Sequence, residues 1–134
     1  MQLEELIENF DFIDDWEDRY RVIIELGQNL PVMPDALKTK NSLVPGCMSQ
    51  VWMVSRMDAE YLHIIADSDA AIVKGLIAVL LLAYANKTPQ EILLVDIKDI
   101  FSRLNLESHL SPNRRNGFYA MVARICAMAK VLGT

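Results

Sequence analysis

Cysteine is the most reactive side-chain type in this 134-residue sequence, and it occurs only twice, as Cys47 and Cys126. Cys47 follows Pro45-Gly46 in the stretch "LVPGCMSQVW", just ahead of an apolar run. A thiol in a loop on a rigid scaffold can act as a nucleophile, but most free cysteines are small buried hydrophobes. The position of Cys47 alone leaves both interpretations open. Cys126 lies in the helical pattern "MVARICAMAK", which favours packing.

The other candidates for chemistry are charged or polar. Asp67, Ser68 and Asp69 could be catalytic, but they precede a helical pattern, where capping and the helix dipole explain them. The basic run "NRRN" at 113–116 falls in the first turn of the last predicted helix, against the preference of the dipole for acids. It is either a solvated face or a place where an arginine meets an anionic partner or stabilises a thiolate.

Several function classes have little support. His63 and His109 are far apart and offer no metal-ligand spacing, so no metal site is expected. The sequence has no glycine-rich phosphate loop, no GxSxG elbow and no Cys–His pair of a known spacing. The net charge of −5 is opposite to that of a nucleic-acid binder.

The composition predicts a soluble protein of the cytoplasm. Apolar residues make up 52% of the chain and charged residues 23%, as in a globular domain. The acidic start "MQLEELIENF" lacks the pattern of a signal peptide, and the apolar run at 75–85 is too short to cross a membrane. Two distant cysteines form no disulfide framework, which favours a reducing compartment.

The elements that must position Cys47 follow from periodicity. Helical spacing predicts a first helix near residues 3–10 and a second after a capping Asp14, ended by Gly27. The segment 29–46 is loop, with room for a short strand near 38–44.

Segments 50–57 and 61–66 are rich in β-branched and aromatic residues, and with only three residues between them they predict an antiparallel hairpin. Helices follow after 67–69, at Thr88-Pro89, over "IKDIFSRL" and after Ser111-Pro112. We therefore expect one α+β domain over residues 1–134, with a small antiparallel sheet packed against several helices.

Four segments in order resemble the SufE family of sulfur-acceptor proteins: "NSLVPGCMSQVW", "DSDAAIVKGLIAVLL", "TPQEIL" and "LSPNRRNGFYAM". The resemblance implies a fold shared with IscU-type iron–sulfur scaffolds. It also implies that Cys47 accepts sulfane sulfur as a persulfide, supported by its loop neighbours Gly46, Ser49 and Gln50. Asp69 and Arg114 occupy the family's acidic and arginine positions, for partner binding or thiolate stabilisation.

The partners that the resemblance implies are a SufS-type cysteine desulfurase, which holds the pyridoxal phosphate, and the SufBCD scaffold. The chain itself would hold no cofactor, would stimulate the desulfurase rather than be an enzyme, and would bind neither nucleic acid nor membrane. A homodimer is possible. Two alternatives stay open: a CsdE-like acceptor for a CsdA-type desulfurase, and an activating module in which Cys47 is incidental. A thiol peroxidase ranks last, because no resolving cysteine is near.

The chemistry of a persulfide and the residues around Cys47 suggest how the carried sulfur is protected. A persulfide is readily lost to other thiols, so a carrier gains by turning its cysteine inward until it docks. We expect the Pro45-Gly46 step to act as a hinge. The apolar flanks Leu43, Val44, Val51 and Trp52 are expected to shelter the sulfur.

Overall fold

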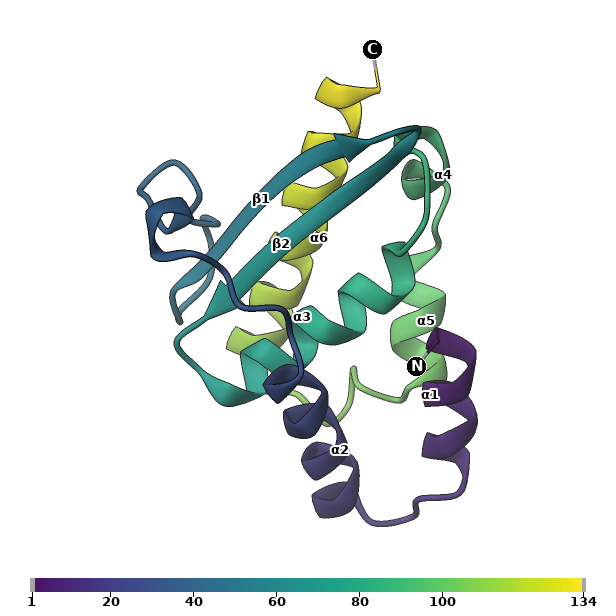
Figure 1. Ribbon diagram of the computed structural model, residues 1–134. Coiled ribbons are helices and arrows are strands. Elements are labelled where there is room, and N and C mark those ends of the chain that lie inside the picture. Colours follow the sequence, from purple (N-terminus) through teal and green to yellow (C-terminus); the bar gives the residue numbers. More distant parts are fainter. Residues whose placement is uncertain (1, 134) are drawn as a thin grey trace.

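A computed structural model describes residues 2–133, in which one antiparallel hairpin and six α-helices form an α+β fold (Figure 1). The helices and strands are α1 (Leu3–Asp11), α2 (Trp16–Gln28), β1 (Val51–Asp58), β2 (Tyr61–Ser68), α3 (Ala71–Tyr84), α4 (Pro89–Leu93), α5 (Ile97–Arg103) and α6 (Pro112–Leu132), with a short 3-10 turn at Asp35–Leu37. The predicted fold class is confirmed.

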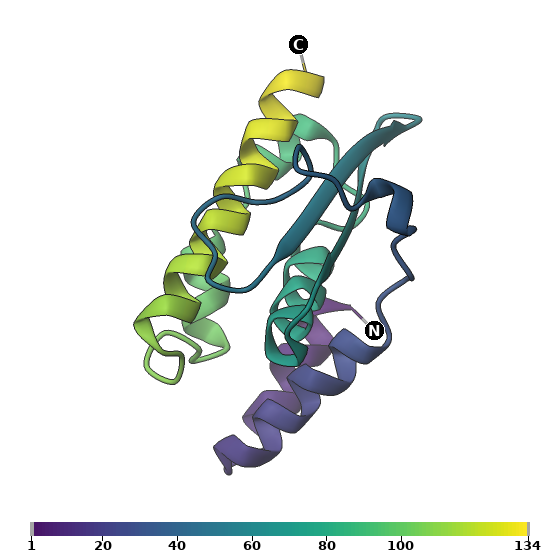
Figure 2. The same cartoon turned by 90° about the vertical axis from the view of Figure 1, so that its left-hand side faces the viewer.

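The hairpin of β1 and β2 is antiparallel, as predicted, and its register pairs Val51 with Ser68 at one end and Asp58 with Tyr61 at the other. The tight turn places Ala59 at a positive φ of 53°. Because side chains alternate between the two faces of a strand, one face carries the buried residues of both strands. That face packs against the helices, and α6 runs behind the hairpin in Figure 1 and beside it in Figure 2.

Helices α2 and α3 pack closely through two glycines. A Cβ on Gly27 would lie 2.5 Å from the backbone nitrogen of Gly75, and a Cβ on Gly75 would lie 2.4 Å from the carbonyl oxygen of Ile23. The prediction that Gly27 ends its helix in a left-handed conformation is wrong. The helix continues to Gln28, and Gly27 instead lets the two backbones approach.

The helix starts are partly as predicted. Thr88 forms a complete capping box with Glu91, and the side chain of Ser111 accepts a hydrogen bond from the backbone of Arg114. The cap of α2 is Asp15 rather than the predicted Asp14. A cap of this kind contributes about 1 kcal/mol to stability.

The largest correction concerns the start of α3. The N-cap residue is Ala70, without any side-chain cap, whereas Asp67 and Ser68 still belong to β2. Strand pairing therefore extends to Ser68, beyond the predicted end of the hairpin. The three polar residues at 67–69 are free to make other contacts.

The segment between α2 and β1 crosses the outside of the hairpin and returns along it (Figures 1 and 2). The short strand expected near 38–44 is only a single bridge, between Leu43 and Trp52. Arg124 of α6 fixes this segment by donating to the carbonyl oxygens of Asn41 at 2.7 Å and Leu43 at 3.4 Å.

None of the helices within residues 2–133 combines the length and the apolar character that a membrane span requires.

Candidate functional site

Cys47 lies in a short loop whose two ends are joined by backbone hydrogen bonds. The N–H of Val44 donates to the carbonyl oxygen of Val51 at 2.8 Å, and the N–H of Met53 donates to that of Ser42, also at 2.8 Å. Six residues, 45–50, thus span the gap between two fixed ends. Gly46 adopts a φ of +87°, a conformation that other residues rarely take. It gives the sharp bend that precedes Cys47.

The thiol of Cys47 turns toward α6. Its Sγ lies 3.6 Å from the carbonyl oxygen of Gly117, to which the S–H donates a weak hydrogen bond. A Cβ on Gly117 would lie 3.7 Å from this sulfur, so the helix offers a bare patch of backbone there. The side chain is half-buried, and burial raises the pKa of the Cys47 thiol above its ordinary value. The resting thiol is therefore mostly protonated near neutral pH.

Beside Cys47 is a pocket of about 400 Å³. It lies between the loop, the start of β1, the first turns of α3 and the first turns of α6. Its lining is Cys47, Met48, Ser49 and Val51 from the loop and β1, Ala70, Ile72, Val73 and Leu76 from α3 and its cap, and Ser111, Asn113, Arg114, Gly117, Phe118 and Met121 from α6 and its cap. The floor of the pocket, which includes the buried residues Val51, Leu76 and Phe118, is apolar. Its polar side chains come from the loop and from the start of α6.

The shelter expected from sequence is only partly the one observed. Val51 lines the pocket, and Val44 is buried in the hydrophobic core. Leu43 and Trp52 do not line it; they form a bridge with each other instead. Of the walls from α3 and α6, the sequence indicates only Arg114 as a neighbour of the thiol, because contacts between distant segments leave no local pattern. Gly117, a glycine inside a helix, is a further signal of close contact.

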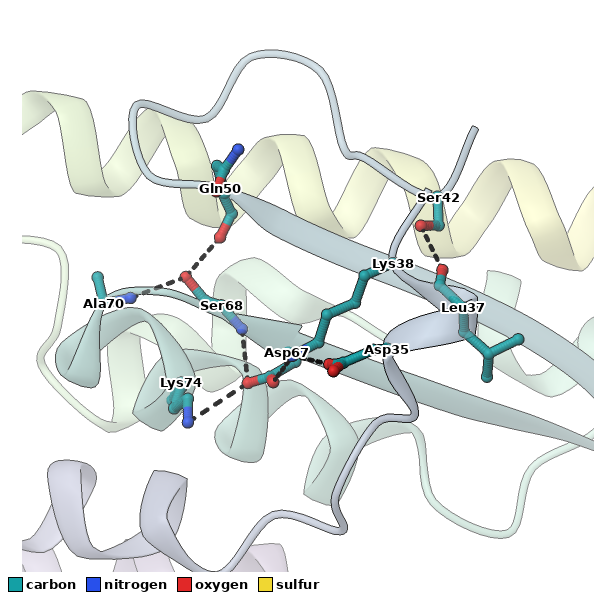
Figure 3. Close-up of polar contacts among 9 residues, drawn as sticks. All are labelled: Asp35, Leu37, Lys38, Ser42, Gln50, Asp67, Ser68, Ala70 and Lys74. Atoms are coloured by element: carbon teal, nitrogen blue, oxygen red, sulfur yellow. Dashed lines mark hydrogen bonds and ion pairs between the residues drawn. The ribbon is translucent and has the colours of Figure 1, made fainter. Parts of the chain in front are cut away.

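The C-terminal end of the loop is tied to the end of β2. The backbone N–H of Gln50 donates to Oδ1 of Asp69 at 3.1 Å. The hydroxyl of Ser68 donates to the carbonyl oxygen of Gln50 at 2.7 Å (Figure 3). The Asp69 N–H adds a longer bond of 3.3 Å to the same carbonyl. Gln50 thus acts through its backbone, and Asp69 holds the loop rather than facing the pocket.

Next to these hydrogen bonds, the carboxylate of Asp67 forms ion pairs with two lysines from different segments (Figure 3). Nζ of Lys38 lies 2.9 Å from Oδ2 and Nζ of Lys74 lies 3.5 Å from Oδ1. Partial burial alone would raise the pKa of the Asp67 carboxyl. The hydrogen bonds from Lys38 and Ser68 and the charge of Lys74 outweigh it, and the pKa is lowered. The carboxylate therefore joins the segment before the loop, the end of β2 and the start of α3.

Two further predicted residues line the pocket: Ser49 from the loop and Arg114 from the first turn of α6. Within residues 2–133 the guanidinium of Arg114 has no hydrogen bond or ion pair; only its backbone N–H is bound, to the Ser111 hydroxyl. The neighbouring Arg115 does not line the pocket, and its guanidinium donates to the carbonyl oxygen of Glu107 at 3.3 Å. Of the two arginines, only Arg114 lines the pocket that Cys47 also lines.

Cys126 is half-buried on α6 and does not line the pocket. The predicted packing role fits this place. His109 also lies away from the pocket, with its ring stacked on Trp16 at a centroid distance of 3.7 Å. Among residues 2–133, no three His, Cys, Asp or Glu side chains gather in a way that could hold a metal ion.

The sequence of this chain is similar to those of one protein family. Residues 4–129 match the family model described as SufE, Fe-S metabolism associated domain. An uncharacterized SufE-like protein of Rhizobium meliloti is 46% identical over 132 residues, covering 96% of this chain and 94% of the relative. One of Rhizobium etli is 44% identical over 133 residues, covering 96% and 90%.

A solved structure has the same fold. The solution structure of a hypothetical protein from Thermus thermophilus matches with a TM-score of 0.79, covering 98% of this chain and 96% of that one. The sequence identity is 21%, so this likeness concerns the fold alone.

Proposed function

The chain belongs to the SufE family, and from that premise we propose that it is a sulfur carrier whose acceptor atom is Sγ of Cys47. It takes sulfane sulfur from a cysteine desulfurase and delivers it for iron–sulfur cluster assembly. The observation that carries this proposal is the position of Cys47: its thiol lies on a six-residue loop between fixed ends and lines a pocket.

The transfer step is an exchange between a thiolate and a persulfide. The Cys47 thiolate attacks the outer sulfur of the desulfurase Cys–S–SH, a new S–S bond forms on Cys47, and the desulfurase thiolate leaves. No net oxidation occurs, so one acceptor thiol is enough. This requirement fits a chain in which Cys126 lies outside the pocket.

The resting structure favours protection of the carried sulfur. Cys47 is half-buried and points toward Gly117, with apolar floor residues of the pocket beside it. To reach a desulfurase active site the loop must turn outward. Since residues 44 and 51 are bonded to each other, we propose that the movement is confined to 45–50, with Gly46 as its hinge.

The partner chemistry follows the family. The pyridoxal phosphate is proposed to belong to a SufS-type desulfurase, and the SufBCD scaffold is the proposed recipient of the sulfur. Arg114, exposed and without a bound partner among the described residues, is the proposed contact for an anionic group of the desulfurase or for the Cys47 thiolate. A reducing cytoplasm, in which Cys47 stays a thiol, suits this role.

The proposal is tested with Cys47→Ser, purified desulfurase and L-cysteine. We expect wild type and the control Cys126→Ser to raise desulfurase turnover in the presence of a reductant, and Cys47→Ser to leave it at the level of the desulfurase alone. Stimulation by Cys47→Ser equal to that by wild type would mean that the chain is an activating module with Cys47 incidental. Running the assay with SufS-type and CsdA-type enzymes separates the SufE role from the CsdE role.

A further inference from the structure

The pocket beside Cys47 is larger than a carried sulfur atom needs. Its volume is about 400 Å³, whereas one water-sized group occupies roughly 30 Å³. A pocket of this size falls in the range that holds small organic molecules. It therefore has room for a compound of amino-acid size in addition to the sulfur on Cys47.

The lining specifies what kind of compound fits. The floor is apolar, with Val51, Leu76 and Phe118 among its residues, and Cys47 presents the thiol. Arg114 brings a guanidinium that no carboxylate within residues 2–133 neutralises. A guanidinium binds a carboxylate through two parallel hydrogen bonds. Asn113, another lining residue, can add an amide hydrogen bond.

We propose that this pocket binds small carboxylate-bearing persulfides, such as the persulfide of an amino-acid thiol, and that Cys47 takes their outer sulfur without a desulfurase. This inference rests on the proposed role of Cys47 as a sulfur acceptor and adds a second class of donor.

The reaction is the same exchange with a small donor, R–S–SH. The Cys47 thiolate attacks the outer sulfur, the S–S bond of the donor breaks, Cys47–S–SH forms, and the thiolate R–S⁻ leaves and takes a proton from water. The carried sulfur keeps its oxidation state, and no other reactant is needed. Arg114 holds the donor by its carboxylate, so that its outer sulfur lies toward Sγ of Cys47.

The experiment compares two donors that differ in the carboxylate alone, cysteine persulfide and cysteamine persulfide. The protein is Cys126→Ser, so that only Cys47 can react, and loading is followed by intact mass spectrometry against time. We expect cysteine persulfide to load Cys47 about fivefold faster than cysteamine persulfide. Arg114→Gln should remove this preference, and the matched control Arg115→Gln, whose arginine lies outside the pocket, should keep it.

Equal rates for the two donors, or a preference that survives in Arg114→Gln, would overturn the inference. A parallel reaction with desulfurase and L-cysteine separates the two proposals. Loading of Cys47 by the desulfurase, without a preference among small donors, overturns the inference and leaves the proposed function intact. Arginine-dependent loading by cysteine persulfide, without loading by the desulfurase, supports the pocket site and overturns the proposed function.

Discussion

Sγ of Cys47 lies 3.6 Å from the carbonyl oxygen of Gly117, although 70 positions separate the two residues in the chain. The contact turns the thiol from its loop toward the first turns of α6. The carbonyl oxygen accepts from the S–H form and disfavours a thiolate, and burial raises the pKa of Cys47 in the same direction. The resting site therefore holds a mostly protonated thiol, and outward movement of the loop would remove both effects.

This arrangement predicts the pH dependence of Cys47 alkylation. Because the folded pKa lies above the ordinary thiol value, the thiolate fraction at neutral pH is smaller than that of a free thiol. The rate of reaction with iodoacetamide should rise with pH along a curve displaced to higher pH. The measurement is a pH–rate profile of Cys126→Ser, with the same protein in denaturant as control; coincident profiles would contradict the prediction.

The hydrogen bond from Gln50 to Asp69 predicts a faster-opening loop when it is removed. Asp69→Ala deletes an acceptor that holds the loop end at 3.1 Å, while the bond from Ser68 to Gln50 remains. Loss of about 1 kcal/mol should raise the alkylation rate of Cys47 about fivefold at constant pH.

The matched control for this change is Asp58→Ala, at the far end of β1. It should leave the alkylation rate unchanged. If Cys47 were alkylated no faster in Asp69→Ala than in wild type, Asp69 would not restrain the loop.

The two lysines on Asp67 predict a pH-dependent loss of stability. The lowered pKa of Asp67 means that its carboxylate stabilises the folded state at pH values above the unfolded pKa of about 4. This contribution disappears as the pH falls through the lower, folded pKa. Asp67→Asn should lower the free energy of unfolding by about 1 to 2 kcal/mol at pH 7, and the difference from wild type should shrink below pH 4.

Urea unfolding at a series of pH values measures this effect. Asp35→Asn is the control, because the Asp35 carboxylate is fully exposed and lies 3.7 Å from Lys38. Exposed pairs contribute little to stability, so Asp35→Asn should unfold close to the wild-type midpoint. If Asp67→Asn lowered the free energy of unfolding by the same amount at pH 7 and below pH 4, the Asp67 charge would not be what stabilises the fold.

Two helical glycines predict opposite outcomes for the same substitution. Gly75→Ala would place a Cβ 2.4 Å from the backbone of Ile23, and overpacking of this kind costs about 2 kcal/mol. Gly117→Ala meets nothing closer than Cys47 Sγ at 3.7 Å, and alanine favours the helix. Thermal unfolding should show a lower Tm for Gly75→Ala alone. Equal Tm values would mean that α2 and α3 can separate at little cost.

The hairpin and most helices could be predicted from sequence because their signals are local. The β-branched and aromatic residues of 50–57 and 61–66 and the capping pattern at Thr88 are signals within short stretches of chain. The wrong predictions concern places where a distant segment decides the outcome. Local spacing favours a helix end at Gly27, whereas the residue that explains this glycine, Gly75, lies far along the chain.

The same reasoning applies to the site. The Pro-Gly step marks Cys47 as a candidate only, and the family resemblance assigns the acceptor role to Cys47 and the supporting roles to Arg114 and Asp69. That Arg114 shares the pocket with Cys47, whereas Asp69 binds the loop backbone, depends on how α6 and β2 approach the loop. Local spacing favours Ser68 as a helix cap, yet its hydroxyl bonds to Gln50 because β2 extends that far. Hydrogen bonds between segments leave no trace in local spacing.

The most direct test of the proposed function locates the transferred sulfur. Wild-type protein is incubated with a cysteine desulfurase and L-cysteine, the remaining thiols are alkylated, and the digested peptides are analysed by mass spectrometry. We predict a persulfide on the peptide that contains Cys47 and an unmodified thiol at Cys126. A persulfide on Cys126, with none on Cys47, would contradict the role of Cys47 as the sulfur acceptor.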